Sequence, residues 1–161
     1  MKKLLLFCLS LSSLAGQGQD TLTAAYINQL VKRTEEQLQF LVMDKKDTLI
    51  YDEKDKHGGD PLEVQTEYYF NLTTNHIEKI VERATYKTVV TELSVYYMQG
   101  QPIKMVTSQW DSTALKVDFD VFFMNNAFIH FTKRCNIPGK PDGEEYIKWC
   151  YELLRSYRPG G

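Results

Sequence analysis

The sequence predicts an α+β fold in which a six-stranded antiparallel meander sheet lies between an N-terminal helix and a C-terminal helix. Three similar segments predict the sheet, because each is an aromatic-rich run, a short turn and a second apolar run, the pattern of a β-hairpin. The segments repeat at Tyr69, Tyr96 and Phe122, with spacings of 27 and 26 residues. Apolar residues at helical spacing before and after the hairpins predict the two helices.

Alternation within the runs predicts antiparallel strands with one buried face. From 115 to 123, every second residue is apolar and points to one side. The residues between them, which point to the other side, are Lys116, Asp118, Asp120 and Phe122. A period of two marks a sheet with one core face and one wetter face, and consecutive hairpins joined by short turns form a meander.

Two amphipathic segments predict the helices. The first runs from about Thr21 to Leu41 and has one apolar stripe beside a mixed-charge remainder. The second follows Asp142, a natural N-cap with Glu145 three residues later as its reciprocal partner. Its apolar face comprises Tyr146, Cys150, Leu153 and Tyr157. Because each helix has one apolar stripe and the sheet has one fully apolar face, we expect both helices on that face.

Between the first helix and the hairpins, the sequence predicts a short strand at Thr48–Tyr51 and a surface loop at Asp52–Pro61. This loop is the longest polar run in the chain and holds two glycines and a proline. A calcium loop needs oxygen ligands at alternate positions and a glycine at the sixth. Counted from Asp52, the third position is Lys54 and the sixth is His57. The pattern therefore favours a solvated loop over a cation site.

The chain begins with the features of a secretory signal peptide. Lys2 and Lys3 precede an apolar run at residues 4–9, and small residues follow. The apolar run is too short to span a bilayer, which needs about 20 residues. We expect residues 1–15 to be removed, with a cleavage site between residues 15 and 19. The protein is then exported to the periplasm, the cell envelope or the exterior of a bacterial cell.

Removal of the leader leaves residues 20–158 as one domain of ordinary size. The full chain has 19 basic and 21 acidic residues, and the loss of Lys2 and Lys3 leaves a net charge of −4. A mildly acidic domain without a basic cluster lacks the electrostatic footprint of a nucleic-acid-binding protein. It also lacks a polybasic segment for an anionic membrane surface, so neither partner is predicted.

Two cysteines remain after removal of the leader, Cys135 and Cys150. In an oxidising compartment, an even pair in a small exported chain is typical of a disulfide. The bond would join the exit of the last strand to the middle of the C-terminal helix. Closing a loop of about 15 residues stabilises a fold by roughly 3 kcal/mol in the chain-entropy model. The alternative is two reduced structural thiols.

Catalytic and metal-binding patterns are missing from the sequence. The histidines His57, His76 and His130 form no close pair at metal-ligand spacing, and there is no His-Glu-x-x-His. There is no Gly-x-Ser-x-Gly elbow and no glycine-rich phosphate loop. We therefore predict no catalytic residue, no metal and no cofactor.

Asp118 and Asp120 form the one carboxylate pair that could do acid–base chemistry. They lie on the same side of one strand, about 7 Å apart by strand rise, and Glu92 falls on the same face. Paired carboxylates act as acid and base when their environments push their pKa values apart. Because Lys116 lies beside them on the wetter face, a solvated surface is the favoured interpretation.

The favoured contact residues are aromatic. Tyr69, Tyr96 and Phe122 occupy matching places in the three hairpins, on the side away from the predicted core. If helices cover only the core face, these rings lie exposed among carboxylates, as at many protein, peptide or glycan contact surfaces. The alternative is that they pack against each other and stiffen the sheet.

The hairpins at Tyr68–Lys79, Tyr96–Lys104 and Phe122–Ile129, together with the leader and helix, resemble small exported bacterial meander-sheet proteins. They are also similar to β-lactamase-inhibitor-like and PepSY-like helix-and-sheet modules of the cell envelope. We expect an exported, non-enzymatic binding domain that contacts a protein, peptide or glycan through the open sheet face. One alternative is an envelope enzyme built on a site that includes His130 and the Asp118 and Asp120 pair. Another is an enzyme inhibitor or immunity-type protein.

Overall fold

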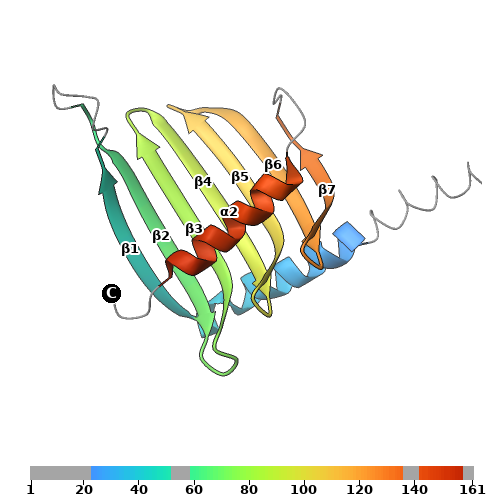
Figure 1. Ribbon diagram of the computed structural model, residues 1–161. Helices are drawn as coiled ribbons and strands as arrows, with labels where there is room; N and C mark the ends of the chain where they lie inside the picture. Colours follow the sequence, from blue (N-terminus) through green and yellow to red (C-terminus); the bar gives the residue numbers. More distant parts are fainter. Residues whose placement is uncertain (1–22, 52–58, 136–141, 158–161) are drawn as a thin grey trace, which may run out of the picture.

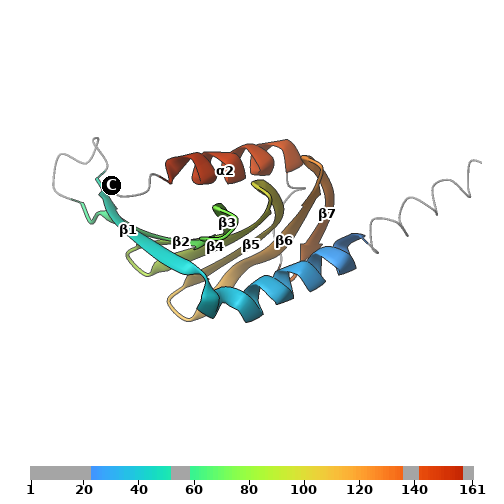
Figure 2. The same cartoon turned by 90° about the horizontal axis from the view of Figure 1, so that it is seen from below.

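The computed structural model describes residues 23–51, 59–135 and 142–157 and shows a curved antiparallel sheet with one helix on each face (Figures 1 and 2). The N-terminal helix is described from residue 23 to residue 37 and is followed by a 3-10 turn, η1, at Leu38–Phe40. The C-terminal helix, α2, spans Gly143–Ser156. The strands are β1 Val42–Ile50, β2 Leu62–Asn71, β3 His76–Tyr86, β4 Val89–Met98, β5 Gln101–Asp111, β6 Ala114–Met124 and β7 Ala127–Lys133.

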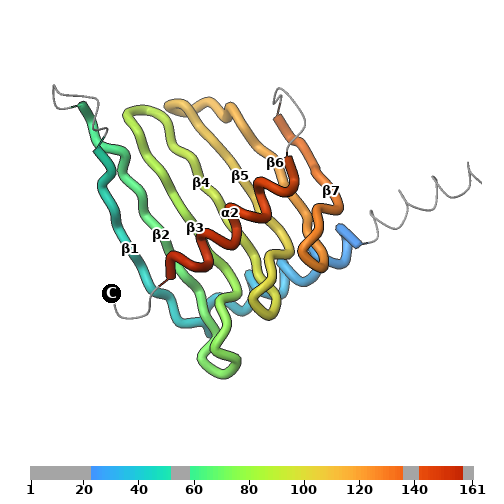
Figure 3. Tube along the Cα trace, viewed as in Figure 1, coloured from blue at the N-terminus to red at the C-terminus, as the bar shows by residue number. Residues whose placement is uncertain are grey.

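The strands pair in sequence order, so the sheet is an uninterrupted meander from β1 to β7 (Figure 3). The α+β architecture with an antiparallel sheet is confirmed, but the sheet has seven strands rather than six. The additional strand is β1, which pairs with β2 along its whole length, whereas the sequence predicts only a short strand at Thr48–Tyr51. Because β1 is exposed on both faces, it lacks the alternation that identifies a half-buried strand.

The hairpin turns use the residues that the sequence offers for them. Asn125 and Asn126 both have positive φ angles, 51° and 60°. This is the arrangement of a two-residue type I′ turn, which matches the twist of the flanking strands. In the preceding hairpin Gln99 and Gly100 have φ angles of 54° and 77°. The turns therefore set the strand register that aligns the three hairpins.

The two helices lie on opposite faces of the sheet, so the prediction that they share one face is wrong (Figure 2). α2 lies in the concave side, the inner face, and the N-terminal helix crosses the convex side, the outer face. Neighbouring residues in the strands supply large apolar side chains to both faces. Tyr97 and Phe123 are buried in the inner-face cluster with α2, whereas Tyr96 and Phe122 are buried against the N-terminal helix. Each face therefore needs its own apolar cover.

The inner face holds the larger apolar core. Its fully buried members are Ile80, Val95, Met105, Val121, Phe123 and Cys150. The helix that covers it begins at a confirmed N-cap, because the Asp142 carboxylate accepts hydrogen bonds from the N–H groups of Glu144 and Glu145. The Tyr97 hydroxyl donates to the Cys150 carbonyl oxygen at 2.7 Å, which links the sheet to the middle of α2.

Cys135 and Cys150 are free thiols that do not lie at disulfide distance, so the predicted disulfide is wrong. The Cys150 side chain faces the sheet and is fully buried in the inner-face core. Cys135 lies beyond the end of β7, where it is partly exposed and its N–H donates to the Asp118 carbonyl oxygen. Burial raises the pKa of the Cys150 thiol to about 12, so this thiol stays protonated at neutral pH.

Alkylation of the native protein tests the free thiols. At pH 8 iodoacetamide should modify Cys135 and leave Cys150 unmodified, because the thiolate is the reactive form and Cys150 is buried and protonated. Peptide mass spectrometry measures the modification of each thiol with and without denaturant, which should equalise them. A linked Cys135–Cys150 peptide in a non-reduced digest would contradict this expectation, as would equal native labelling.

Candidate functional site

One row of side chains crosses the outer face in register, with one residue from each strand from β2 to β7. In order, its members are Tyr69, Lys79, Tyr96, Lys104, Phe122 and His130. We call these six residues the aromatic–lysine row. From Tyr69 to Phe122, aromatic rings and lysines alternate, so that each lysine has an aromatic ring on both sides. His130 ends the row.

The three predicted contact residues belong to this row but do not form an exposed surface. Tyr96 is 7% exposed and Phe122 is 2% exposed, because Ile27 and Val31 of the N-terminal helix pack over them. Tyr69, at the β2 end of the row, is partly buried. The expectation of an open aromatic face is therefore wrong for this part of the sheet.

The lysines of the row are buried among the rings. The Lys79 ammonium lies 5.8 Å from the centroid of the Tyr69 ring and 5.2 Å from that of Tyr96. The Lys104 ammonium lies 5.0 Å from the centroid of Phe122. A cation at this distance from a ring is attracted to the π system, by about 2 kcal/mol when the pair is desolvated. The rings therefore replace part of the hydration that each ammonium loses.

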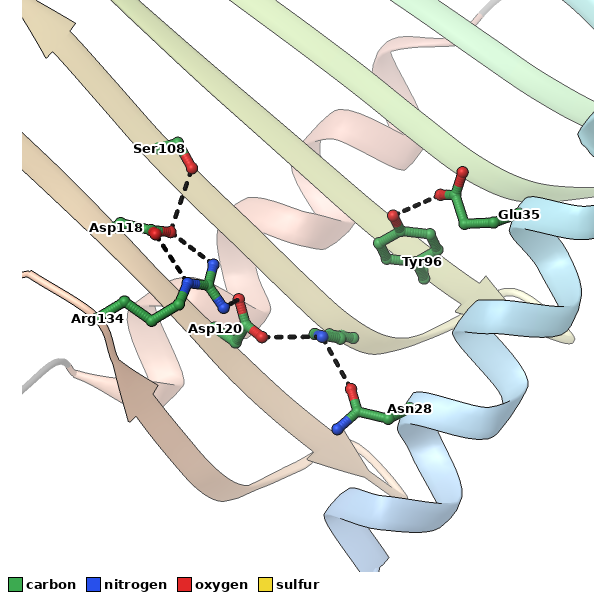
Figure 4. Close-up of polar contacts among 8 residues, drawn as sticks. Asn28, Glu35, Tyr96, Ser108, Asp118, Asp120 and Arg134 are labelled. Atoms are coloured by element: carbon green, nitrogen blue, oxygen red, sulfur yellow. Dashed lines mark hydrogen bonds and ion pairs between the residues drawn. The ribbon is translucent and has the colours of Figure 1, made fainter. Parts of the chain in front are cut away.

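Glu35 of the N-terminal helix completes the β3–β4 part of the row. Its Oε1 accepts a hydrogen bond from Lys79 Nζ at 2.7 Å. The same oxygen accepts one from the Tyr96 hydroxyl at 2.6 Å (Figure 4). Burial alone would raise the pKa of Glu35, but these two hydrogen bonds and the Lys79 charge lower it below its ordinary value. Burial, followed by the bond to Glu35, raises the pKa of Tyr96. Both groups therefore keep one protonation state across the physiological range.

Lys104 joins the helix to β6. Its Nζ lies 2.9 Å from Asp120 Oδ2 and 2.9 Å from Asn28 Oδ1 of the N-terminal helix (Figure 4). The side chains of Lys104 and Asp120 are only 10% and 8% exposed. A charge buried this deeply is tolerated only when it is paired and hydrogen-bonded. The pair is thus a fixed structural element of the outer face.

Arg134, just beyond β7, holds both aspartates of the predicted carboxylate pair. Its Nε donates to Asp118 Oδ2 at 2.8 Å, and its Nη1 lies 2.8 Å from Asp120 Oδ1. The hydrogen bonds from Arg134, against a smaller effect of burial, lower the pKa of Asp118, and Ser108 also donates to this carboxylate. Asp118 therefore remains ionised, which suits an ion pair better than a general acid.

His130 belongs to the same face but does not join the aspartates. Its ring lies 5.6 Å from the Phe122 ring, centroid to centroid. Within the described part of the chain, His130 makes no hydrogen bond to Asp118 or Asp120, and no cluster of three His, Cys, Asp or Glu groups has the arrangement of a metal site. The structure thus brings the two aspartates together with Arg134 and Lys104 rather than with His130.

The rest of the outer face, beside the N-terminal helix, carries polar residues in register. Gln65 lies opposite Arg83, which lies opposite Glu92, and in the next row Val81 lies opposite both Glu67 and Ser94. Two adjoining hollows of about 620 Å³ and 200 Å³ share Gln65 and Arg83. We call their combined lining the outer-face groove. It comprises Asp47, Thr48, Leu49, Glu63, Val64, Gln65, Glu67, Lys79, Val81, Arg83, Thr85, Val90, Glu92 and Ser94.

Two further hollows lie at helix ends. One, of about 220 Å³, lies between the N-terminal helix and the hairpin turns and includes Arg33 and His76. The other, of about 490 Å³, lies between the C-terminal end of α2 and β1 and includes Lys46 and Arg155. Neither has the register-aligned polar side chains of the outer-face groove, so the groove is the candidate site.

The sequence also contains a signal for the two lysines of the row, separate from the aromatic repeat. Lys79 and Lys104 follow an isoleucine shortly after the turns of the first and second hairpins, and His130 holds the matching place in the third. In each hairpin, a lysine or histidine on the second strand recurs opposite an aromatic residue on the first strand. This repeat predicts a row in which aromatic residues alternate with lysine or histidine. The partners Asn28, Glu35 and Arg134 have no such signal, because they come from outside the repeat.

No protein-family model, curated protein or solved structure matches the chain. Neither of the two helices, as far as the structure describes them, combines the length and the apolar character needed to cross a bilayer. The functional assignment therefore rests on the geometry of the outer face.

Removal of the Lys104 ammonium should destabilise the fold. Among the described residues, the variant Lys104→Met leaves Arg134 as the remaining cation beside the buried Asp120 and removes the donor to Asn28 Oδ1. We expect a loss of about 3 kcal/mol in the free energy of unfolding, measured by urea denaturation.

Lys116→Met is the matched control, since Lys116 is exposed on the neighbouring strand β6. It should change the free energy of unfolding by less than about 0.5 kcal/mol. Equal stability of the two variants would show that the buried pair does not hold the outer face together.

Proposed function

We propose that the protein is an exported, non-enzymatic binding domain that contacts a protein or peptide through the outer-face groove. The observation that supports this most directly is a polar sheet surface, uncovered beside the N-terminal helix and hollowed to about 620 Å³. Side chains on a rigid sheet are held in fixed positions, which suits recognition. The leader at residues 1–15 supports export and lies outside the described residues.

The charges of the groove indicate the chemistry of the partner. Four carboxylates line it, those of Asp47, Glu63, Glu67 and Glu92. Of the two cations in the lining, Lys79 is already paired with Glu35, and Arg83 is exposed. The groove is therefore net acidic, and a segment with lysine or arginine side chains would complement it.

A glycan is the less favoured ligand for this groove. No aromatic residue is among the described residues that line the groove. Tyr69, two residues from Glu67, is partly buried, and its hydroxyl donates to Glu67 at 2.7 Å. The groove thus presents charged groups of both signs rather than an exposed ring. Charged groups of both signs favour a polypeptide partner with complementary charges.

The enzyme alternative, with His130, Asp118 and Asp120 as its site, has weaker support. A catalytic carboxylate pair needs one member with a raised pKa, whereas Arg134 lowers that of Asp118. The inhibitor or immunity-type alternative is a special case of the binding proposal, in which the basic partner is itself an enzyme. The resemblance to PepSY-like and β-lactamase-inhibitor-like envelope modules agrees with such a binding role and stays a prediction.

Affinity capture with a charge reversal in the groove tests the proposal. Wild type and Glu92→Lys are immobilised and exposed to a native cell-envelope extract. A partner bound through the acidic groove should be retained by wild type and reduced at least about tenfold by Glu92→Lys, because an attraction becomes a repulsion. Quantitative mass spectrometry of the eluates measures the retention.

Glu152→Lys is the matched control, because it makes the same charge change at an exposed position on α2, on the other side of the molecule. It should retain the partner as wild type does. Equal capture by all three proteins would contradict the groove as the contact surface, and so would the absence of any partner retained by wild type.

A further inference from the structure

The β1 strand is an open edge of the sheet. Within the described part of the chain it pairs only with β2, at the edge of the sheet (Figure 1). All nine of its residues are exposed. Four of them are large apolar residues with exposed fractions between 38% and 56%, namely Val42, Met43, Leu49 and Ile50. An exposed edge strand with apolar side chains is a template for pairing with another strand. The structure therefore raises the question of which strand pairs with it.

The β1 sequence is complementary to itself in an antiparallel pairing, in which Lys45 meets the opposite charge of Asp47 and apolar residues meet apolar residues. We propose that β1 pairs antiparallel with β1 of a second copy of this chain, about a two-fold axis at Lys46. All nine residues are paired in this register, since Lys46 is the midpoint of Val42–Ile50. Each residue lies opposite the residue of the other copy that is equally far from Lys46 but on its other side.

Charge complementarity supports this register. Lys45 of each copy lies opposite Asp47 of the other, which gives two cross-strand ion pairs. In the single chain Lys45 Nζ lies 3.9 Å from Asp47 Oδ1, and both side chains are well exposed, so both are available to a partner. Opposite charges directly across two strands stabilise the pairing, and like charges destabilise it.

The apolar residues match in the same register. Val42 lies opposite Ile50, and Met43 lies opposite Leu49, at each end of the paired strands. A shift of the axis to Lys45 would place Met43 opposite Asp47 and leave Leu49 and Ile50 without a partner within β1. The axis at Lys46 is therefore the arrangement that satisfies both the charges and the apolar side chains.

One pair of like charges remains, because Lys46 lies opposite its own copy. Asp44 is two residues away on the same side of the strand, so each copy contributes one Asp44 as a diagonal neighbour of these lysines. The central group then holds two positive and two negative charges. Diagonal neighbours lie within reach of long side chains, so Asp44 offsets the repulsion.

The backbone geometry agrees with the same axis. Paired residues have numbers that are both odd or both even, so the side chains of each pair lie on the same face. The two-fold axis is then perpendicular to the sheet, which becomes continuous through the dimer. Both outer faces lie on one side, with the Asp47 and Leu49 ends of the two grooves next to the shared strands. The pairing itself does not depend on the proposed function.

A charge-exchange experiment tests the pairing. Sedimentation equilibrium of the purified exported protein should show a monomer–dimer equilibrium. Lys45→Asp and Asp47→Lys should each raise the dissociation constant about tenfold or more, because both cross-strand ion pairs become like-charge pairs. An equimolar mixture of the two variants should form dimers again, since the acidic positions of one variant face the basic positions of the other.

Lys148→Asp, an exposed change on α2, is the control and should dimerise as wild type does. Thermal unfolding should show that all variants remain folded. The proposal is overturned if the wild-type protein stays monomeric at every concentration. A wild-type protein that pairs only with a different protein also overturns it. It is also overturned by single variants that dimerise like wild type, or by a mixture that stays monomeric.

Discussion

Two buried lysine ammonium groups determine how this molecule is assembled. The side chains of Lys79 and Lys104 are 11% and 10% exposed, and an ammonium at such depth is costly unless oxygen atoms surround it. The strands supply one of these partners, Asp120. The N-terminal helix supplies the others, Glu35 and Asn28. The helix therefore supplies oxygen acceptors to the two lysines in place of water, and its apolar residues cover the rings of the row.

This constraint divides the outer face into two parts with different properties. Near the hairpin turns, the helix seals Tyr96 and Phe122 against solvent. Towards β1 and β2, the same face is uncovered and its polar residues remain in register from strand to strand. The burial of the aromatic row and the exposure of the acidic groove thus have one cause, the position of the N-terminal helix. The part of the face left open is where contact with a partner is proposed.

The features that depend on local pattern follow from the sequence. Three hairpins, the Asn and Gly turns and the Asp142 cap are all found, because each depends on residues close together in the chain. The matching places of Tyr69, Tyr96 and Phe122 in one row also follow, since the repeat preserves the strand register.

The features that depend on long-range packing do not follow. β1 has no alternation, because both of its faces meet solvent. Tyr96 and Tyr97 are neighbours that are buried on opposite faces, each under a different helix. Polar residues such as Asp118 and Asp120 share the outer face with Tyr96 and Phe122, so the alternation predicts only one covered face. Likewise, the spacing of Cys135 and Cys150 suits a disulfide, but the direction of the Cys150 side chain is set by α2 packing on the inner face. Arg134 lies 16 positions from Asp118 in the sequence, and no local pattern predicts its ion pairs with Asp118 and Asp120.

The N-terminal helix is anchored on the outer face through the buried lysines. A double-mutant cycle with Glu35→Ala and Lys79→Met measures this anchoring directly, because these residues are 44 positions apart and touch only if the helix lies there. Residues in contact couple, so the two changes should be non-additive by about 1 kcal/mol in the free energy of unfolding. Additivity within about 0.3 kcal/mol would mean that Glu35 and Lys79 are not in contact and that the helix lies elsewhere.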